Sequence, residues 1–187
     1  MVLFVNACVR TESRTRRLAD ALIHKLQCEV AEVRLAEIHF PTVNADFLAK
    51  RDSLIAAGAW SDPMFDLARQ FAEASMIIIA APYWDLSFPA ALKQYFEQIN
   101  VMGITFRYTP EGTPEPLCAA KKLYYVTTAG GAFVPEEFGF GYVKTMAQSF
   151  YGIQDVELIK AVGLDIYGVD VEQILNDSIN AIPYPAV

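Results

Sequence analysis

The sequence has little cysteine: 187 residues include only Cys8, Cys28 and Cys118, and no C-x-x-C pair. An odd number of cysteines without that spacing favours neither a disulfide framework nor a zinc site. We therefore expect a reduced, cytoplasmic protein and predict no metal ligands.

Long hydrophobic runs and basic charge are also scarce. The apolar stretch at residues 76–81 stops at Pro82, far short of the ~20 residues that span a bilayer. Residues 1–9 lack the basic region and cleavage site of a signal peptide. There are 15 Lys and Arg against 22 Asp and Glu, a net charge of −7. This balance argues against a nucleic acid or an anionic membrane as the partner.

What the sequence does contain is hydrophobic residues, at 53% of the chain. That content and length predict one domain over residues 1–187 with a sizeable core. Apolar segments of strand length alternate with helical patterns, which indicates an α/β fold. Strands are predicted at residues 2–9, 28–35, 76–81, 123–128 and 156–162, with a short extra strand at 104–108. Helices are predicted at residues 15–26, 63–74, 88–99 (with Ser87 as N-cap) and 169–182.

The second and fifth of the main strands are more polar than the others, as edge strands are. We therefore predict a three-layer α/β fold around a five-stranded parallel sheet of order 2-1-3-4-5. In such sheets a ligand binds beyond the carboxyl ends of the strands, where the strand order reverses. The loops after the first, third and fourth strands are thus the candidate site.

Each of these loops has its own chemistry. The loop at residues 10–15 offers hydroxyls, arginines and a helix N-terminus, which suit a phosphate; the alternative is an ordinary helix cap with solvated arginines. Residues 82–89 supply aromatic side chains for an apolar wall, unless these are core. The paired glycines of residues 127–131 allow close backbone approach, or simply a flexible turn. Together the loops predict a site for a phosphorylated planar cofactor.

Four segments in order carry a resemblance to a known family: Asn6-Ala7-Cys8-Val9-Arg10 through Ser13-Arg14-Thr15, then Pro82-Tyr83-Trp84 with Pro89-Ala90-Ala91-Leu92-Lys93, then Gly103-Ile104-Thr105-Phe106-Arg107-Tyr108, then Thr127-Thr128-Ala129-Gly130-Gly131. With them, nearly the whole chain resembles the flavodoxin-like NAD(P)H:quinone and azo-compound oxidoreductases that bind FMN.

The resemblance implies a role for each loop. The residues implied to hold the FMN phosphate are Arg10, Ser13, Arg14 and Thr15. Those implied to line the isoalloxazine are Pro82, Tyr83, Trp84, Asp85 and Leu86. Those implied to meet its pyrimidine edge are Thr128, Ala129, Gly130 and Gly131. Tyr108 and Phe133 are implied to border the substrate. Asp85 departs from the pattern, because some relatives carry Asn there and a carboxylate cannot donate to flavin N5. Ala129 departs too, since it replaces a larger or polar residue.

The implied activity is ping-pong transfer of two electrons from NAD(P)H, through tightly bound FMN, to a quinone or azo acceptor. No side chain need act as acid or base, so we predict no catalytic residue. A flavodoxin-type electron carrier and a flavin-bound redox sensor are the alternatives. The resemblance also implies a homodimer with a shared active site. The surface predicted to join the subunits combines the apolar stripe of residues 88–99 with Val101, Met102, Phe133, Phe138, Phe140 and Tyr142.

Overall fold

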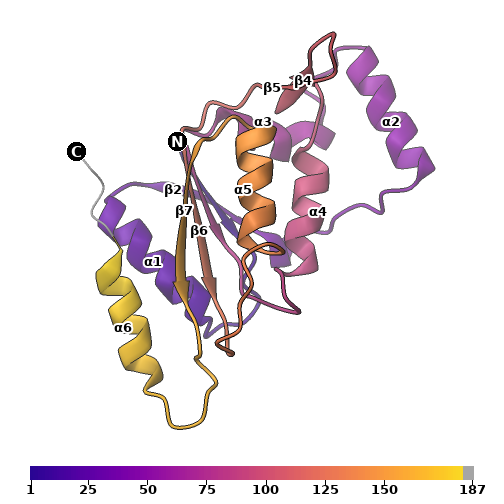
Figure 1. Ribbon diagram of the computed structural model, residues 1–187. Coiled ribbons are helices and arrows are strands. Elements are labelled where there is room, and N and C mark those ends of the chain that lie inside the picture. The colour runs from indigo at the N-terminus through magenta and orange to yellow at the C-terminus, as the bar shows by residue number, and fades with distance from the viewer. Residues whose placement is uncertain (183–187) are drawn as a thin grey trace.

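The computed structural model describes residues 1–182 and is built on a five-stranded parallel sheet of order β2-β1-β3-β6-β7 (Figure 1). Its strands are β1 (Val2–Asn6), β2 (Val30–Arg34), β3 (Met76–Ala80), β6 (Lys122–Thr128) and β7 (Asp155–Ala161). Because these are the five main strands in chain order, the predicted order 2-1-3-4-5 is confirmed.

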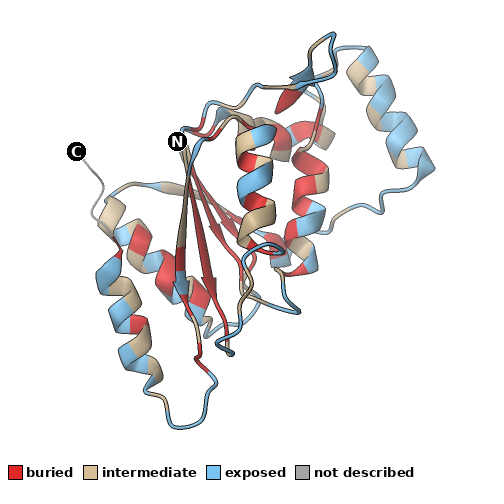
Figure 2. Cartoon of the chain, viewed as in Figure 1, coloured by how far each residue is buried: buried red, intermediate tan, exposed pale blue. Residues whose placement is uncertain are grey.

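Helices cover both faces of the sheet (Figure 1). One face carries α1 (Arg14–Leu26) and α6 (Val171–Ala181); the other carries α3 (Asp66–Glu73), α4 (Ala90–Ile99) and α5 (Phe140–Ser149). Successive strand residues point to opposite faces, so Leu3 and Val5 enter one core cluster while Phe4 enters the other. The central strands are buried on both sides (Figure 2).

Two helices were not predicted from the sequence, α2 (Ala45–Ala56) and α5. Helix α2 projects from the body and has no buried residue (Figures 1 and 2). Its Phe47, Leu54 and Ile55 are only partly buried, so the one-sided apolar stripe by which a helix is recognised is weak. Short 3-10 turns, η1 (Leu35–Glu37) and η2 (Pro63–Phe65), flank it in the chain.

Helix α4 begins later than predicted, and the prediction of Ser87 as its N-cap is wrong. The residue at the cap is Pro89, which makes no side-chain cap hydrogen bond. The Ser87 hydroxyl instead donates to the Phe138 carbonyl oxygen at 2.7 Å. Ser87 therefore tethers the chain after β3 to the loop before α5.

A two-stranded antiparallel hairpin, β4 (Phe106–Tyr108) with β5 (Pro114–Pro116), lies apart from the main sheet. The chain after it is held where the strands begin, since the Lys121 N–H donates to the Ser75 carbonyl just before β3. The hairpin is thus at the amino edge of the sheet, opposite the strand tips (Figure 1). Tyr108 consequently lies far from the loops that follow the strands.

Candidate cofactor site

A cavity of about 260 Å³ lies beyond the carboxyl ends of the central strands. It is lined by Arg10, Glu12, Ser13, Arg14, Pro82, Trp84, Thr128, Ala129, Gly130, Leu164 and Asp165. All three loops predicted from the sequence therefore meet in one place. The fourth contributor, the chain after β7, was not predicted.

One end of the cavity is the N-terminus of α1. The Ser13 hydroxyl caps the helix by accepting from the Arg16 N–H at 3.2 Å, and the Ser13 carbonyl accepts from Arg17 N–H. The N–H groups of Arg14 and Thr15 remain among the donors that a helix start leaves unpaired. With the helix dipole, these donors favour an anion.

The two arginines that line this end differ in their partners. Arg14 Nη1 donates to Asp165 Oδ1 at 2.7 Å across the cavity. For Arg10, no hydrogen bond or ion pair occurs within residues 1–182. Arg10 is therefore a cation available to a ligand, whereas Arg14 already has a carboxylate beside it.

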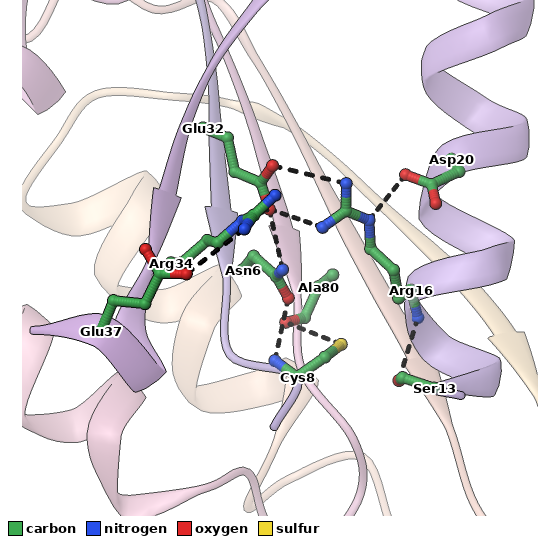
Figure 3. Close-up of polar contacts among 9 residues, drawn as sticks. All are labelled: Asn6, Cys8, Ser13, Arg16, Asp20, Glu32, Arg34, Glu37 and Ala80. Atoms are coloured by element: carbon green, nitrogen blue, oxygen red, sulfur yellow. Dashed lines mark hydrogen bonds and ion pairs between the residues drawn. The ribbon is translucent and has the colours of Figure 1, made fainter. Parts of the chain in front are cut away.

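Behind the loop, a polar network fixes its shape (Figure 3). The Asn6 side chain accepts from the Cys8 N–H at 2.9 Å and donates to Glu32 Oε1 at 2.9 Å. Arg16 Nη1 reaches the same Glu32 oxygen at 2.6 Å. This arrangement turns the chain at Asn6, which explains why β1 ends three residues earlier than predicted.

The electrostatics of the network centre on Glu32. Burial raises the pKa of this carboxyl, but hydrogen bonds from Asn6 and Arg34 and the charge of Arg16 outweigh burial and hold it below its ordinary value. Arg16 is thereby committed to Glu32, as Arg17 is to Glu172 at 2.7 Å. Only half of the basic cluster at residues 10–17 faces the cavity.

Beside this loop, the Cys8 side chain has no sign of reactivity. Burial raises the pKa of its thiol above the ordinary value, and nearby Ser13 and Arg16 do not offset that effect. A protonated, half-buried thiol is a poor nucleophile. Cys8 is thus a small packing residue at the start of the loop, as its type usually is.

The other end of the cavity is built from strained backbone. Trp84 and Ser87 exchange N–H to carbonyl hydrogen bonds of 3.0 and 2.8 Å, closing a turn over Asp85 and Leu86. Both corner residues have positive φ, 51° and 67°, as a type I′ turn requires. A leucine in this conformation is strained, and such strain concentrates at ligand sites.

The side chains around this turn divide between the cavity and the protein. Trp84 lines the cavity and is 38% exposed, so it can form an apolar wall. Tyr83 turns away, because its hydroxyl donates to the Pro135 carbonyl oxygen at 3.2 Å. Asp85 and Leu86 are not among the lining residues either. Any contact they make to a ligand must come from beyond the cavity rim.

Two more predicted site residues, Thr15 and Gly131, do not line the cavity. Thr15 is buried, and its hydroxyl lies 2.6 Å from that of Thr128, joining α1 to β6. Gly131 also lies outside the lining and has open space around it. Gly130 does line the cavity, and a Cβ there would lie 2.1 Å from Asp165 Oδ2.

Three lining residues, Glu12, Leu164 and Asp165, were missed in the sequence reading. Glu12 lay within the predicted loop but carries the wrong charge for a phosphate. The other two follow β7, whose carboxyl end meets the same sheet edge as the other strands. The strand at residues 156–162 was predicted, so the loop that follows it could have been included in the candidate site.

The two residues predicted to border the substrate do not line the cavity of their own chain. Tyr108 belongs to the hairpin at the opposite edge of the sheet (Figure 1). Phe133 lies on the loop after β6 with 78% of its surface exposed. Their roles stay predictions, and that of Tyr108 requires a second subunit.

The cavity fits FMN at its polar end and only partly encloses it. Arg10, the α1 N-terminus and the Ser13 hydroxyl match a phosphate, and Trp84 with the glycine loop matches an apolar ring. The volume is below the about 300–1,000 Å³ of typical small-molecule sites. These lining residues would therefore hold only part of FMN.

A larger groove, of about 710 Å³, lies between α2 and α3. Its lining is mainly apolar, with Phe40, Phe47, Met64 and Leu67 among its residues. None of its lining residues is an arginine or a glycine. The convergence of arginines, a helix start and a glycine loop therefore places the candidate site in the smaller cavity. Within residues 1–182, no helix is long and apolar enough to cross a membrane, and no cluster of metal-ligating side chains is present.

A doubly wound parallel sheet with an anion site and an aromatic wall at its switch point defines an α/β nucleotide- or flavin-binding protein. A family model described as flavodoxin-like fold matches residues 1–182. The chain therefore belongs to the flavodoxin-like fold family, and the resemblance seen in the sequence is confirmed.

Known relatives share almost the full length. A Clostridium perfringens protein named FMN-dependent NADH:quinone oxidoreductase is 36% identical over 187 residues, covering 95% of this chain and 93% of its own. One of the same name from Coprothermobacter proteolyticus is 37% identical, with 95% and 93% covered. The crystal structure of an azoreductase from Bacillus anthracis superposes with a TM-score of 0.83 at 25% identity, covering 96% of this chain and 94% of that one.

Proposed function

We propose that this protein is an FMN-dependent oxidoreductase that passes two electrons from NADH or NADPH to a quinone or azo acceptor. The observation that carries the proposal is the cavity in which the α1 N-terminus and Arg10 face Trp84 and the glycine loop. Relatives named for this activity, over nearly the whole length, support it. When bound, FMN supplies the two-electron chemistry.

The chain's own residues bind the cofactor and orient it. Arg10, Arg14, Ser13 and the first N–H groups of α1 hold the phosphate, while Thr15 fixes their position through Thr128. Trp84 and Pro82 cover the ring on one side and exclude water. The Trp84, Ser87 and Ala129 N–H groups are used within the protein. The N–H groups of Asp85, Leu86, Gly130 and Gly131 are left for its polar edge, where donors stabilise added negative charge. No side chain is assigned as an acid or base.

Nicotinamide and acceptor use one place in turn, so the kinetics are ping-pong. The purified protein should be yellow with flavin absorbance. Under anaerobic conditions, NADH or NADPH should bleach this absorbance. Parallel double-reciprocal lines with a quinone support alternating occupancy. A colourless protein that does not bind FMN contradicts the proposal, and a flavin that neither nucleotide reduces favours a carrier.

The working unit is a homodimer in the cytoplasm, with each chain a single FMN-binding domain. Part of the predicted interface packs within the chain instead: the Phe88 and Tyr142 ring centroids are 5.5 Å apart, and Val101 is buried. The apolar side chains that support a dimer interface are Met102, Phe133 and Phe138, because they are exposed in the single chain. Sedimentation of the FMN-bound protein at micromolar concentration should give a dimer; a monomer contradicts this.

A further inference from the structure

The loop after β7 places a carboxylate inside the cavity that receives the phosphate. Asp165 is separated from Arg14 by 151 positions, yet Asp165 Oδ1 accepts from Arg14 Nη1 at 2.7 Å. The ion pair closes one side of the cavity, because both residues are among its lining. An exposed ion pair of this kind contributes little to the free energy of folding. A role in ligand binding would explain why the pair lies in the cavity.

The position of Asp165 is fixed by backbone. The Asp165 N–H donates to the Gly130 carbonyl at 2.9 Å, and Gly163 N–H to the Gly131 carbonyl at 2.9 Å. These bonds tie the loop after β7 to the loop after β6. The close approach of the two loops suits a glycine at position 130, since a Cβ there would lie 2.1 Å from Asp165 Oδ2.

The charges in the cavity balance before any ligand enters. Arg10 and Arg14 contribute two positive charges, and Glu12 and Asp165 two negative ones. A phosphate must therefore compete with Asp165 for Arg14, and its own charge is repelled by the same carboxylate. A neutral side chain at position 165 would remove both costs.

We propose that Asp165 sets the affinity for FMN: it holds Arg14 as an internal counterion and is displaced from it by the cofactor phosphate. Asp165 is thus a positioning residue that acts through Arg14. The inference rests on the proposed function, since FMN must bind in this cavity.

The test uses the full chain freed of cofactor and titrated with FMN or with riboflavin, which lacks the phosphate. Asp165→Asn should tighten FMN about fivefold, the effect of roughly 1 kcal/mol, and leave riboflavin unchanged. In the Arg14→Gln background, the same substitution should have less than half that effect. Asp177→Asn, which removes a charge on α6 beyond the cavity, is the matched control and should leave both affinities unchanged.

Each other outcome is informative. Unchanged or weaker FMN binding by Asp165→Asn overturns the inference, as does equal tightening of FMN and riboflavin. An undiminished effect in the Arg14→Gln background overturns the route through Arg14. If the unsubstituted protein binds neither ligand, the proposed function fails instead. Circular dichroism of each variant shows whether it is folded.

Discussion

The two ends of the cavity are built by different means. The phosphate end depends on charged side chains, with Arg10 and Arg14 in front and the Glu32 network behind. The ring end depends on backbone, with two positive-φ residues in the 84–87 turn and a glycine pressed against Asp165. Ion pairs at the surface are replaceable, whereas a backbone shape permits few substitutions.

This difference teaches where each end is vulnerable. At the phosphate end, a substitution changes charge, so it should alter ligand affinity and the pH dependence of stability. At the ring end, a substitution changes packing or backbone strain, so it should alter the free energy of unfolding. Gly130 lies where the ends meet, so it should be the most sensitive position of those compared below.

Gly130→Ala is expected to have the largest effect. The new Cβ would lie 2.1 Å from Asp165 Oδ2 and 3.1 Å from Asp165 Cβ. The carboxylate can swing away only by leaving Arg14, and the bond from the Asp165 N–H to the Gly130 carbonyl restrains the Cβ. The free energy of unfolding should therefore fall by about 1–3 kcal/mol. Urea denaturation measures this. Gly131→Ala is the matched control, with open space around it, and should change stability by less than about 0.5 kcal/mol. Equal losses at both positions would contradict the close contact.

Glu32→Gln should have an intermediate effect that depends on pH. The folded-state pKa of Glu32 is lowered, so its contribution is present above the unfolded-state pKa of about 4.3 and is lost as pH falls through the folded-state pKa. The variant should be less stable than the parent by about 1–2 kcal/mol at pH 7. This deficit should shrink as pH falls below 4.3.

Urea titrations at pH 7 and in this acid range measure the change. Glu37→Gln serves as a control, because Glu37 is exposed and, within residues 1–182, pairs with Arg34 alone. A deficit for Glu32→Gln that stays constant across the range would show that its charge is not what matters.

Leu86→Gly should have the smallest effect, and of opposite sign. Glycine adopts φ of 67° without strain, so relief of the left-handed conformation should exceed the entropy it adds to the unfolded chain. We expect a gain of about 0.5–1 kcal/mol. Asp85→Gly should gain less, since Asp tolerates this region better. Thermal unfolding would detect it; a loss of stability would mean that the Leu86 side chain holds the turn.

Much of the fold was readable because its physical signals are local. Buried strands such as β3 give continuous apolar runs, and α1 gives a one-sided stripe after a serine cap. Helix α2 has no fully buried residue and gives only a weak stripe, and it was missed. The boundary of β1 depended on the Asn6 side chain, whose partner Glu32 lies 26 positions away.

The sequence by itself determined the sheet order and the three loops that meet at one edge. The spacing of hydrophobic residues and the polarity of each strand are local properties of the sequence. Only the tertiary structure decided which residues face the cavity. It divided the arginines between the cavity and the Glu32 network and turned Tyr83 away from the cavity. It also placed Tyr108 at the far edge and brought Asp165 to Arg14. These outcomes depend on contacts between distant segments, and no local pattern encodes such contacts.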